Sequence, residues 1–224
     1  LHVFVDIFNA YGTQALRPFS KKWVALGVIN TFDPYIFGFH CLGIMLWAFG
    51  TDPVWTFGIM YVIIICYYIL RFMVQKAVKN AVHSAIQDEE YVIVAPTMRF
   101  FYWRIAAASK THYYVGRAYR RSVNIYDKFE IVPLPRTPHV HAAMQDANLQ
   151  SFVSFSPLYR WEISELPSGF TELRLIDLRY RSNNRYPFVA VAHVNDNLEV
   201  VNSYTGWIFS EDKLQQKLQI GASD

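Results

Sequence analysis

The stretch that most constrains the fold is an apolar double run over Pro34–Leu70, which carries one charge, Asp52, near its middle. Each half, Pro34–Thr51 and Pro53–Leu70, has about the length that a helix rising about 1.5 Å per residue needs to cross a hydrocarbon core of about 30 Å. The intervening Gly50-Thr51-Asp52-Pro53 has turn chemistry, and proline is tolerated in the first turn of a helix. We therefore expect a transmembrane helical hairpin. The alternative is a pair of helices buried in a soluble core.

The charges are divided unevenly along the chain. Before Asp88 there are six Lys and Arg residues against three Asp and Glu, and from Asp88 onward there are fifteen of each sign. The net charge of +3 therefore belongs to the apolar part, which argues against a basic domain face that binds nucleic acid. The basic residues flank the double run on both sides and are absent from its turn: Arg17, Lys21, Lys22, Arg71, Lys76 and Lys79. By the positive-inside rule, we expect a multi-pass plasma-membrane protein, in contact with the lipid bilayer, with both ends of the hairpin in the cytoplasm.

The chain is predicted to contain two domains. The membrane domain, residues 1–87, holds the end of one helix, transmembrane helices over about 34–51 and 53–72, and a connector helix. Residues 88–224 form a cytoplasmic, mainly antiparallel β domain, because short runs rich in aromatic and β-branched residues alternate there with turn signals. These runs are Tyr91–Val94, Tyr102–Ala106, His112–Tyr119, Ser122–Tyr126, Arg160–Ile163, Glu172–Leu178, Phe188–Val194 and Leu198–Tyr204. A helical insert over His139–Phe152 and a terminal helix over Glu211–Leu218 complete an α+β membrane protein.

The first residues contain the clearest candidate site. His2, Asp6 and Asn9 interrupt an apolar stretch at i, i+4 and i+7, which is one face of a helix that Gly12 could cap. A His and an Asp one turn apart can bind one divalent ion, and ionisable groups in apolar surroundings are costly unless they are used. The spacing makes His2 and Asp6 candidate metal ligands. The alternative is a His–Asp hydrogen bond that joins membrane helices.

The same stretch carries a resemblance to a known family. Leu-His-Val-Phe-Val-Asp-Ile-Phe-Asn-Ala-Tyr-Gly, followed by Arg17-Pro18-Phe19, resembles the second signature of membrane-bound metal-dependent hydrolases of the YdjM type. Three later stretches, Ser154–Trp161, Asp177–Arg181 and Asn202–Trp207, are similar to the cytoplasmic tail of the YfhP-like branch. The resemblance therefore covers nearly the whole chain. The family's first signature, His-Arg-Gly-x-Thr-His-Ser, would precede Leu1, so we expect this chain to be a fragment.

Two functions are compatible with these features. The resemblance implies a metal-dependent hydrolase in which His2 and Asp6 are ligands of a divalent ion, with zinc as the ion and Asn9 orienting them. The bound ion would activate water, and a phosphoester or lipid-like substrate would suit the membrane. The alternative is a non-enzymatic scaffold, in which the hairpin anchors a β domain that binds a cytoplasmic protein. The upstream sequence would separate the two, because a His-rich segment there would complete the metal site.

Three further groups of residues are weaker candidates. His139 and His141, with Asp146, could bind a metal if their segment were extended, although ordinary surface histidines are the simpler interpretation. His40 is an ionisable residue within the first apolar run, which makes it a candidate functional residue. Arg179 and the segment Tyr180–Tyr186 could form a patch that binds anions or lipid headgroups, or a solvated turn.

Overall fold

The computed structural model describes residues 2–221, and the chain separates into two compact units. One unit contains Leu1–Ile105 and Gly116–Tyr126, and the other contains Ala106–Val115 and Asp127–Asp224. Helices α1 to α3 belong to the first unit, and the second of the two sheets belongs to the second unit.

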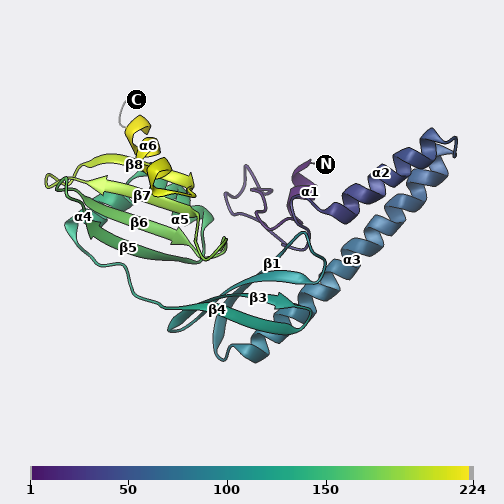
Figure 1. Cartoon of the computed structure of the whole chain (residues 1–224), viewed down its shortest axis with the longest axis horizontal. Helices are drawn as coiled ribbons and strands as arrows, with labels where there is room; N and C mark the ends of the chain where they lie inside the picture. The colour runs from purple at the N-terminus through teal and green to yellow at the C-terminus, as the bar shows by residue number, and fades with distance from the viewer. Residues whose placement is uncertain (1, 222–224) are drawn as a thin grey trace. The chain divides into compact units, whose positions relative to one another are not determined.

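Two helices of the first unit begin in the same way. α2 (Pro34–Ala48) follows Asp33 and α3 (Pro53–Ala85) follows Asp52, and each aspartate accepts hydrogen bonds from backbone N–H groups of the first turn. An acceptor at the N-cap and a proline at the first helical position are what a helix start requires. Between the helices, Gly50 has φ +92°, which favours glycine. The turn therefore lies at the predicted residues, between Ala48 and Pro53, and α2 and α3 lie side by side (Figure 1).

The lengths of these helices differ from the prediction. α2 ends at Ala48, not at residue 51, and its 15 residues rise about 22 Å. α3 has 33 residues and rises about 50 Å, so the predicted helix 53–72 and the connector helix after it are one continuous helix. Among the described residues, α3 alone is long and apolar enough to cross a membrane. The Ala/Val/Lys pattern after Arg71 contains no proline or glycine, so nothing interrupts the helical hydrogen bonding there.

One stripe of α3 is buried along its whole length. Its members recur every three or four residues, which keeps them on one helix face: Met60, Ile64, Tyr67, Arg71, Gln75, Val78 and Val82. The opposite face of the first half exposes large apolar side chains, including Ile59, Ile65 and Ile69. The second half of α3 packs against the first strand of the β part.

The first sheet has the strand order β1-β2-β3-β4. Its strands are β1 (Glu89–Pro96), β2 (Tyr102–Ser109), β3 (His112–Tyr119) and β4 (Ser122–Glu130). Loops of two residues join β2 to β3 and β3 to β4, which forces antiparallel pairing. No residue of β4 is buried, and exposure alternates along it as expected for an edge strand with one face toward water.

The second sheet is also antiparallel, in the order β5-β6-β7-β8. Its strands are β5 (Tyr159–Glu165), β6 (Thr171–Asp177), β7 (Phe188–Val194) and β8 (Val200–Trp207), with Ala190 of β7 opposite Leu175 and Thr205. Ala190, Ala192 and Val194 pack with α4 (Pro138–Met144) and α5 (Ala147–Phe155). Val189 and Val191, on the other face of the same strand, pack with α6 (Glu211–Gly221). Helices therefore cover both faces of this sheet (Figure 1).

Each of the eight predicted strand runs overlaps one strand, although Leu178 lies beyond β6 and Leu198, with φ +65°, lies in the turn before β8. The antiparallel prediction is confirmed, although the strands form two separate sheets. The helical insert predicted over His139–Phe152 is two helices, because Asp146 caps a new helix by accepting hydrogen bonds from the N–H groups of Asn148 and Leu149. The terminal helix is confirmed and extends to Gly221. The division into residues 1–87 and 88–224 stays a prediction.

Candidate functional site

The three residues predicted from the first helix lie together. His2 and Asp6 are on α1 (His2–Asp6), and His2 Nε2 lies 3.1 Å from Asp6 Oδ2. Asn9 Nδ2 donates to Asp6 Oδ1 at 3.4 Å, so the carboxylate of Asp6 contacts both partners, one through each oxygen. The His2 side chain is largely exposed, whereas that of Asp6 is about one-third exposed, at 34%.

Asn9 is held by the turn that follows α1. Its Oδ1 accepts hydrogen bonds from the N–H groups of Tyr11 at 2.9 Å and Gly12 at 2.6 Å. Gly12 has φ +70°, and a Cβ there would lie 2.3 Å from the carbonyl oxygen of Val24, so only glycine fits. Gly12 therefore shapes a turn that directs the Asn9 amide toward Asp6, and it does not cap α1, which ends at Asp6.

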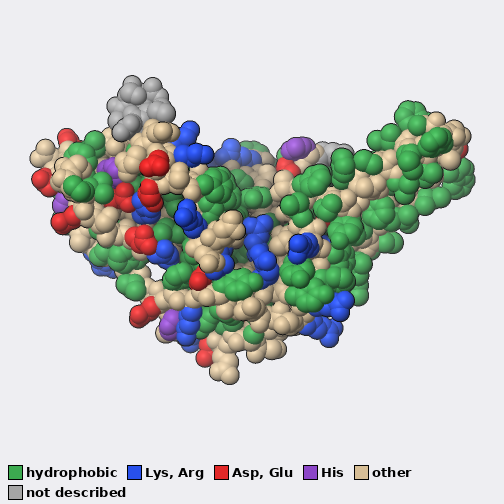
Figure 2. Space-filling view, viewed as in Figure 1, with side chains coloured by type: hydrophobic (Ala, Val, Ile, Leu, Met, Phe, Trp, Pro, Cys, Tyr) green, Lys and Arg blue, Asp and Glu red, His purple; other side chains and the backbone are tan. Residues whose placement is uncertain are grey.

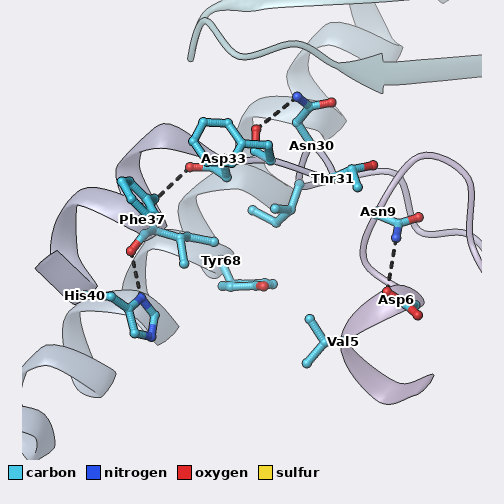
Figure 3. Close-up of a pocket in the computed structure, with 12 residues that line it drawn as sticks. Val5, Asp6, Asn9, Asn30, Thr31, Asp33, Phe37, His40 and Tyr68 are labelled. Atoms are coloured by element: carbon cyan, nitrogen blue, oxygen red, sulfur yellow. Dashed lines mark hydrogen bonds between the residues drawn. The ribbon is translucent and has the colours of Figure 1, made fainter. Parts of the chain in front are cut away.

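Asp6 and Asn9 line a pocket of about 320 Å³ (Figure 3). Other pocket residues come from the segment before α2, from the first turns of α2, and from α3. The full lining is Val5, Asp6, Asn9, Ile29, Asn30, Thr31, Phe32, Asp33, Ile36, Phe37, His40 and Tyr68. Half of these twelve residues have polar or charged side chains, so the pocket combines apolar walls with several polar groups that could orient a ligand.

Two ionisable residues of this pocket are already engaged. Asp33 Oδ1 caps α2, and its Oδ2 accepts a hydrogen bond from the Tyr67 hydroxyl at 2.9 Å. His40 Nδ1 lies 2.7 Å from the carbonyl oxygen of Ile36, and because a carbonyl oxygen can only accept, Nδ1–H is the donor of this hydrogen bond. His40, a candidate from the sequence, therefore lines the same pocket as Asp6.

The geometry of His2 and Asp6 is compatible with one shared ion. Two ligands at about 2.0–2.1 Å from a tetrahedral zinc lie about 3.3 Å from each other, and the 3.1 Å between His2 Nε2 and Asp6 Oδ2 is close to this value. Within residues 2–221, however, no group of three or more His, Cys, Asp or Glu side chains is arranged to hold a metal. These two residues fit as part of a metal site, and no third His, Cys, Asp or Glu side chain of the described residues joins them.

The second histidine pair is on a helix, not on an extended edge. His139 and His141 belong to α4, where residues two apart project about 200° from each other around the axis. Asp146 caps α5 and accepts a hydrogen bond from the Ser203 hydroxyl. The structure does not bring these three side chains to a common site.

The arginines after β6 are bound to carboxylates. Arg179 Nη2 donates to the buried Asp177 at 2.6 Å, and Asp177 also accepts from the Ser156 hydroxyl. Arg181 pairs with Asp127. Burial raises the pKa of Asp127, but hydrogen bonds from Tyr186 and Arg181 outweigh burial and hold this pKa below its usual value. The predicted anion patch is therefore largely neutralised within the protein.

Sequence analysis missed the most constrained polar residues of the first unit. Arg71, counted above as a charge flanking the membrane span, is fully buried: Nε donates to the Val28 carbonyl at 2.9 Å and Nη1 to the Phe100 carbonyl at 2.6 Å. Its guanidinium stacks on the Trp103 ring, 4.2 Å from the centroid. Gln75, one turn later, donates to the carbonyls of Leu26 and Gly27. The i, i+4 spacing of polar residues in a long apolar helix was the signal available in the sequence.

Comparison with known proteins assigns the chain to a family. It is 54% identical over 223 residues to the uncharacterized protein YfhP of Bacillus subtilis (strain 168), and the match covers 99% of this chain and 68% of that protein. The chain belongs to the YfhP family. Three family models match along it: YdjM inner membrane protein over residues 1–78, YfhP middle domain over 87–129, and YfhP C-terminal alpha/beta plait domain over 138–218. No solved structure matches the chain.

The comparisons confirm the resemblance to YdjM and YfhP that the sequence motifs predicted. Together with the length and apolarity of α3, the inner-membrane family identifies the chain as a membrane protein in contact with a lipid bilayer. The YfhP C-terminal model covers the second sheet and its helices α4 to α6 almost completely. None of the matched names states a reaction, so hydrolase activity belongs to the proposal below.

Proposed function

We propose that the chain is a membrane-bound, metal-dependent hydrolase in which His2 and Asp6 hold a divalent ion beside the pocket. The observation that carries the proposal is the 3.1 Å separation between His2 Nε2 and Asp6 Oδ2, next to a cavity of about 320 Å³. Such an ion, when bound, lowers the pKa of a coordinated water and supplies a nucleophile near neutral pH. A complete zinc site of this kind needs at least one more ligand beside His2 and Asp6.

The residues around the pocket would have distinct roles. Asn9 fixes one oxygen of Asp6 through its amide and leaves the other oxygen toward His2. The apolar side chains of Ile29, Ile36 and Phe37 would hold an apolar group of the substrate and exclude water from it. This lining supports a phosphoester or lipid-like substrate, whose polar group would lie at Asp6.

Replacement of Asp6 by Asn in the full-length natural protein tests the metal site. We expect the wild type to bind zinc or another divalent ion and Asp6→Asn to lose most of it while still entering the membrane, because Asn keeps the size but not the charge. Metal content of the purified protein would be measured by mass spectrometry. Asp212→Asn, in the exposed first turn of α6, is the matched control. Equal metal content in wild type and Asp6→Asn would refute the enzyme proposal.

We further propose that α2 and α3 enter the bilayer together as a hairpin, with residues 88–224 in the cytoplasm. Exposed apolar side chains on both helices and the absence of basic residues from the turn support this orientation. Single cysteines at Thr51 and Ser168, both exposed, would be introduced after Cys41 and Cys66 are changed to Ser. An impermeant reagent added to intact cells should label position 51 and not position 168. Labelling of position 168 would reverse the orientation.

A non-enzymatic scaffold is the second candidate. It is favoured because the second sheet has its own apolar cores and supplies none of the residues that line the pocket. In that case the His2–Asp6 contact only stabilises the first helix, and the second sheet binds a cytoplasmic protein. The Asp6→Asn experiment separates the candidates, since a scaffold predicts no change in metal content.

A further inference from the structure

The segment between α1 and α2 contains a closed loop. Thr13 N donates to the Val24 carbonyl at 3.0 Å and Val24 N donates to the Thr13 carbonyl at 2.9 Å, so the two ends of the loop pair with each other. Inside it, Arg17 N donates to the Gln14 carbonyl and Ser20 N to the Leu16 carbonyl. These bonds give the segment, called here the basic loop (residues 13–24), a defined shape.

The tip of the basic loop combines exposed apolar side chains with exposed positive charge. Phe19 is 96% exposed, which is the largest exposure given for a large apolar side chain in the described chain, and Leu16 is 51% exposed. Arg17, Lys21 and Lys22 are also exposed, and residues 13–24 contain no acidic residue. A phenyl ring held almost wholly in water is unfavourable, whereas the same ring is stabilised when it enters an apolar phase. Apolar side chains surrounded by Lys and Arg are typical of surfaces that bind anionic membranes.

We propose that the basic loop inserts into the bilayer surface and binds anionic lipid headgroups. Phe19 and Leu16 enter the boundary between headgroups and acyl chains, while Arg17, Lys21 and Lys22 bind lipid phosphates. The proposal rests on the membrane placement of α2 and α3 given above. It is supported by the charge complementarity of three cations with no acid among them, and by the position of the loop in the same compact unit as these helices (Figure 1). An acidic protein surface would match the charges, but it would not account for a phenyl ring at the tip that is 96% exposed.

A fluorophore on the loop tests insertion directly. Phe19→Cys, in the full chain with Cys41 and Cys66 changed to Ser, would carry an environment-sensitive dye in vesicles of phosphatidylcholine and phosphatidylglycerol. We expect a blue-shifted emission, quenching by lipids with a nitroxide near the headgroup, and protection from aqueous iodide. The same dye at Phe209→Cys, an exposed aromatic position of the second unit, is the control and should remain accessible to iodide. A dye at Ile59→Cys reports separately on α3.

The charges are tested with a triple variant, Arg17→Gln, Lys21→Gln and Lys22→Gln. We expect iodide protection of the Phe19 dye to fall about tenfold in this variant, and to fall similarly in phosphatidylcholine alone. The matched control changes the exposed Lys110, Arg117 and Arg121 to Gln, which removes the same charge from the first sheet and should change nothing.

The outcomes separate this proposal from the one on which it rests. A Phe19 dye as accessible to iodide as the Phe209 dye, with the Ile59 dye protected, would overturn loop insertion and leave the membrane placement of α3 intact. Accessible dyes at both Phe19 and Ile59 would overturn both. Equal insertion in neutral and anionic vesicles would overturn the binding of anionic headgroups.

Discussion

The α2–α3 pair and the second sheet distribute their polar and apolar side chains in opposite ways. In the second sheet, apolar residues of β6 and β7 are buried under α4 to α6, as in a water-soluble domain. On α3, large apolar side chains such as Ile59 and Ile65 are exposed, while Arg71 and Gln75 are buried. Figure 2 shows apolar side chains gathered over the α2–α3 pair. An exposed apolar surface of this extent is stabilised beside another apolar phase, in agreement with the membrane placement proposed for α2 and α3.

The polar side chains that are buried on α3 form hydrogen bonds with other segments of the chain. Tyr67, Arg71 and Gln75 donate hydrogen bonds to Asp33 and to backbone carbonyls of the preceding segment and of the β1–β2 region. A backbone carbonyl in an apolar environment is costly unless it accepts a hydrogen bond. The polar stripe therefore connects α3 to the irregular segment before α2 and to the first sheet.

Removal of Arg71 should have the largest effect. Arg71→Met keeps much of the side-chain volume, but it leaves the buried carbonyls of Val28 and Phe100 without donors and removes the cation from the Trp103 ring. We expect the free energy of unfolding to fall by about 4 kcal/mol. Thermal unfolding in detergent, followed by circular dichroism, would measure it. Lys79→Met, exposed on the same helix, is the control, and equal stability of both variants would show that the polar stripe is dispensable.

A charge introduced on the exposed face of α3 tests whether that face lies in an apolar phase. Ile65 is 59% exposed, so Ile65→Lys would be harmless in water but should cost about 3 kcal/mol in a bilayer. We expect less of the variant in the membrane fraction of cells. Val201→Lys, at an exposed apolar position of the second sheet, should change stability by no more than about 0.5 kcal/mol. If the two substitutions behaved alike, the contrast between the regions would be lost.

The smallest predicted effect lies inside the second sheet and depends on pH. Burial raises the pKa of Glu172, but bonds with His193 and Arg174 outweigh it and hold this pKa below its ordinary value of 4.5. A carboxylate with a lowered folded-state pKa stabilises the fold above the unfolded-state pKa, and this contribution is lost as the pH falls below 4.5. Glu172→Gln should lower the free energy of unfolding by about 2 kcal/mol at neutral pH and flatten its decline in acid.

Urea unfolding of the full chain between neutral pH and pH values below 4.5 would measure this slope, with the signal of the second sheet followed separately. Glu165→Gln, at an exposed position of β5, is the control, because it removes the same charge without a buried partner. If Glu172→Gln lost stability in acid as steeply as the wild type, groups other than Glu172 would cause the acid sensitivity.

Local patterns in the sequence were sufficient for the secondary structure. The aromatic and β-branched runs predicted all eight strands, and Asp-Pro after a turn marked the starts of α2 and α3. The i, i+4 spacing of His2 and Asp6 predicted their contact. These features depend on propensities, caps and side chains one helical turn apart, all of which act over a few residues. Their role in metal binding stays a prediction.

Tertiary structure decided the features that depend on distant residues. Arg71 looked like a charge at a membrane boundary, but Val28, Phe100 and Trp103 surround it. The pocket joins Asp6 to His40 across some thirty residues of chain, and no local pattern links the two. The strands after residue 88 divide into two sheets, which the strand runs alone did not predict because strand pairing depends on contacts between residues far apart in the sequence. The sequence sets the propensity of each segment, but burial is a property of the neighbours that the whole chain brings to it.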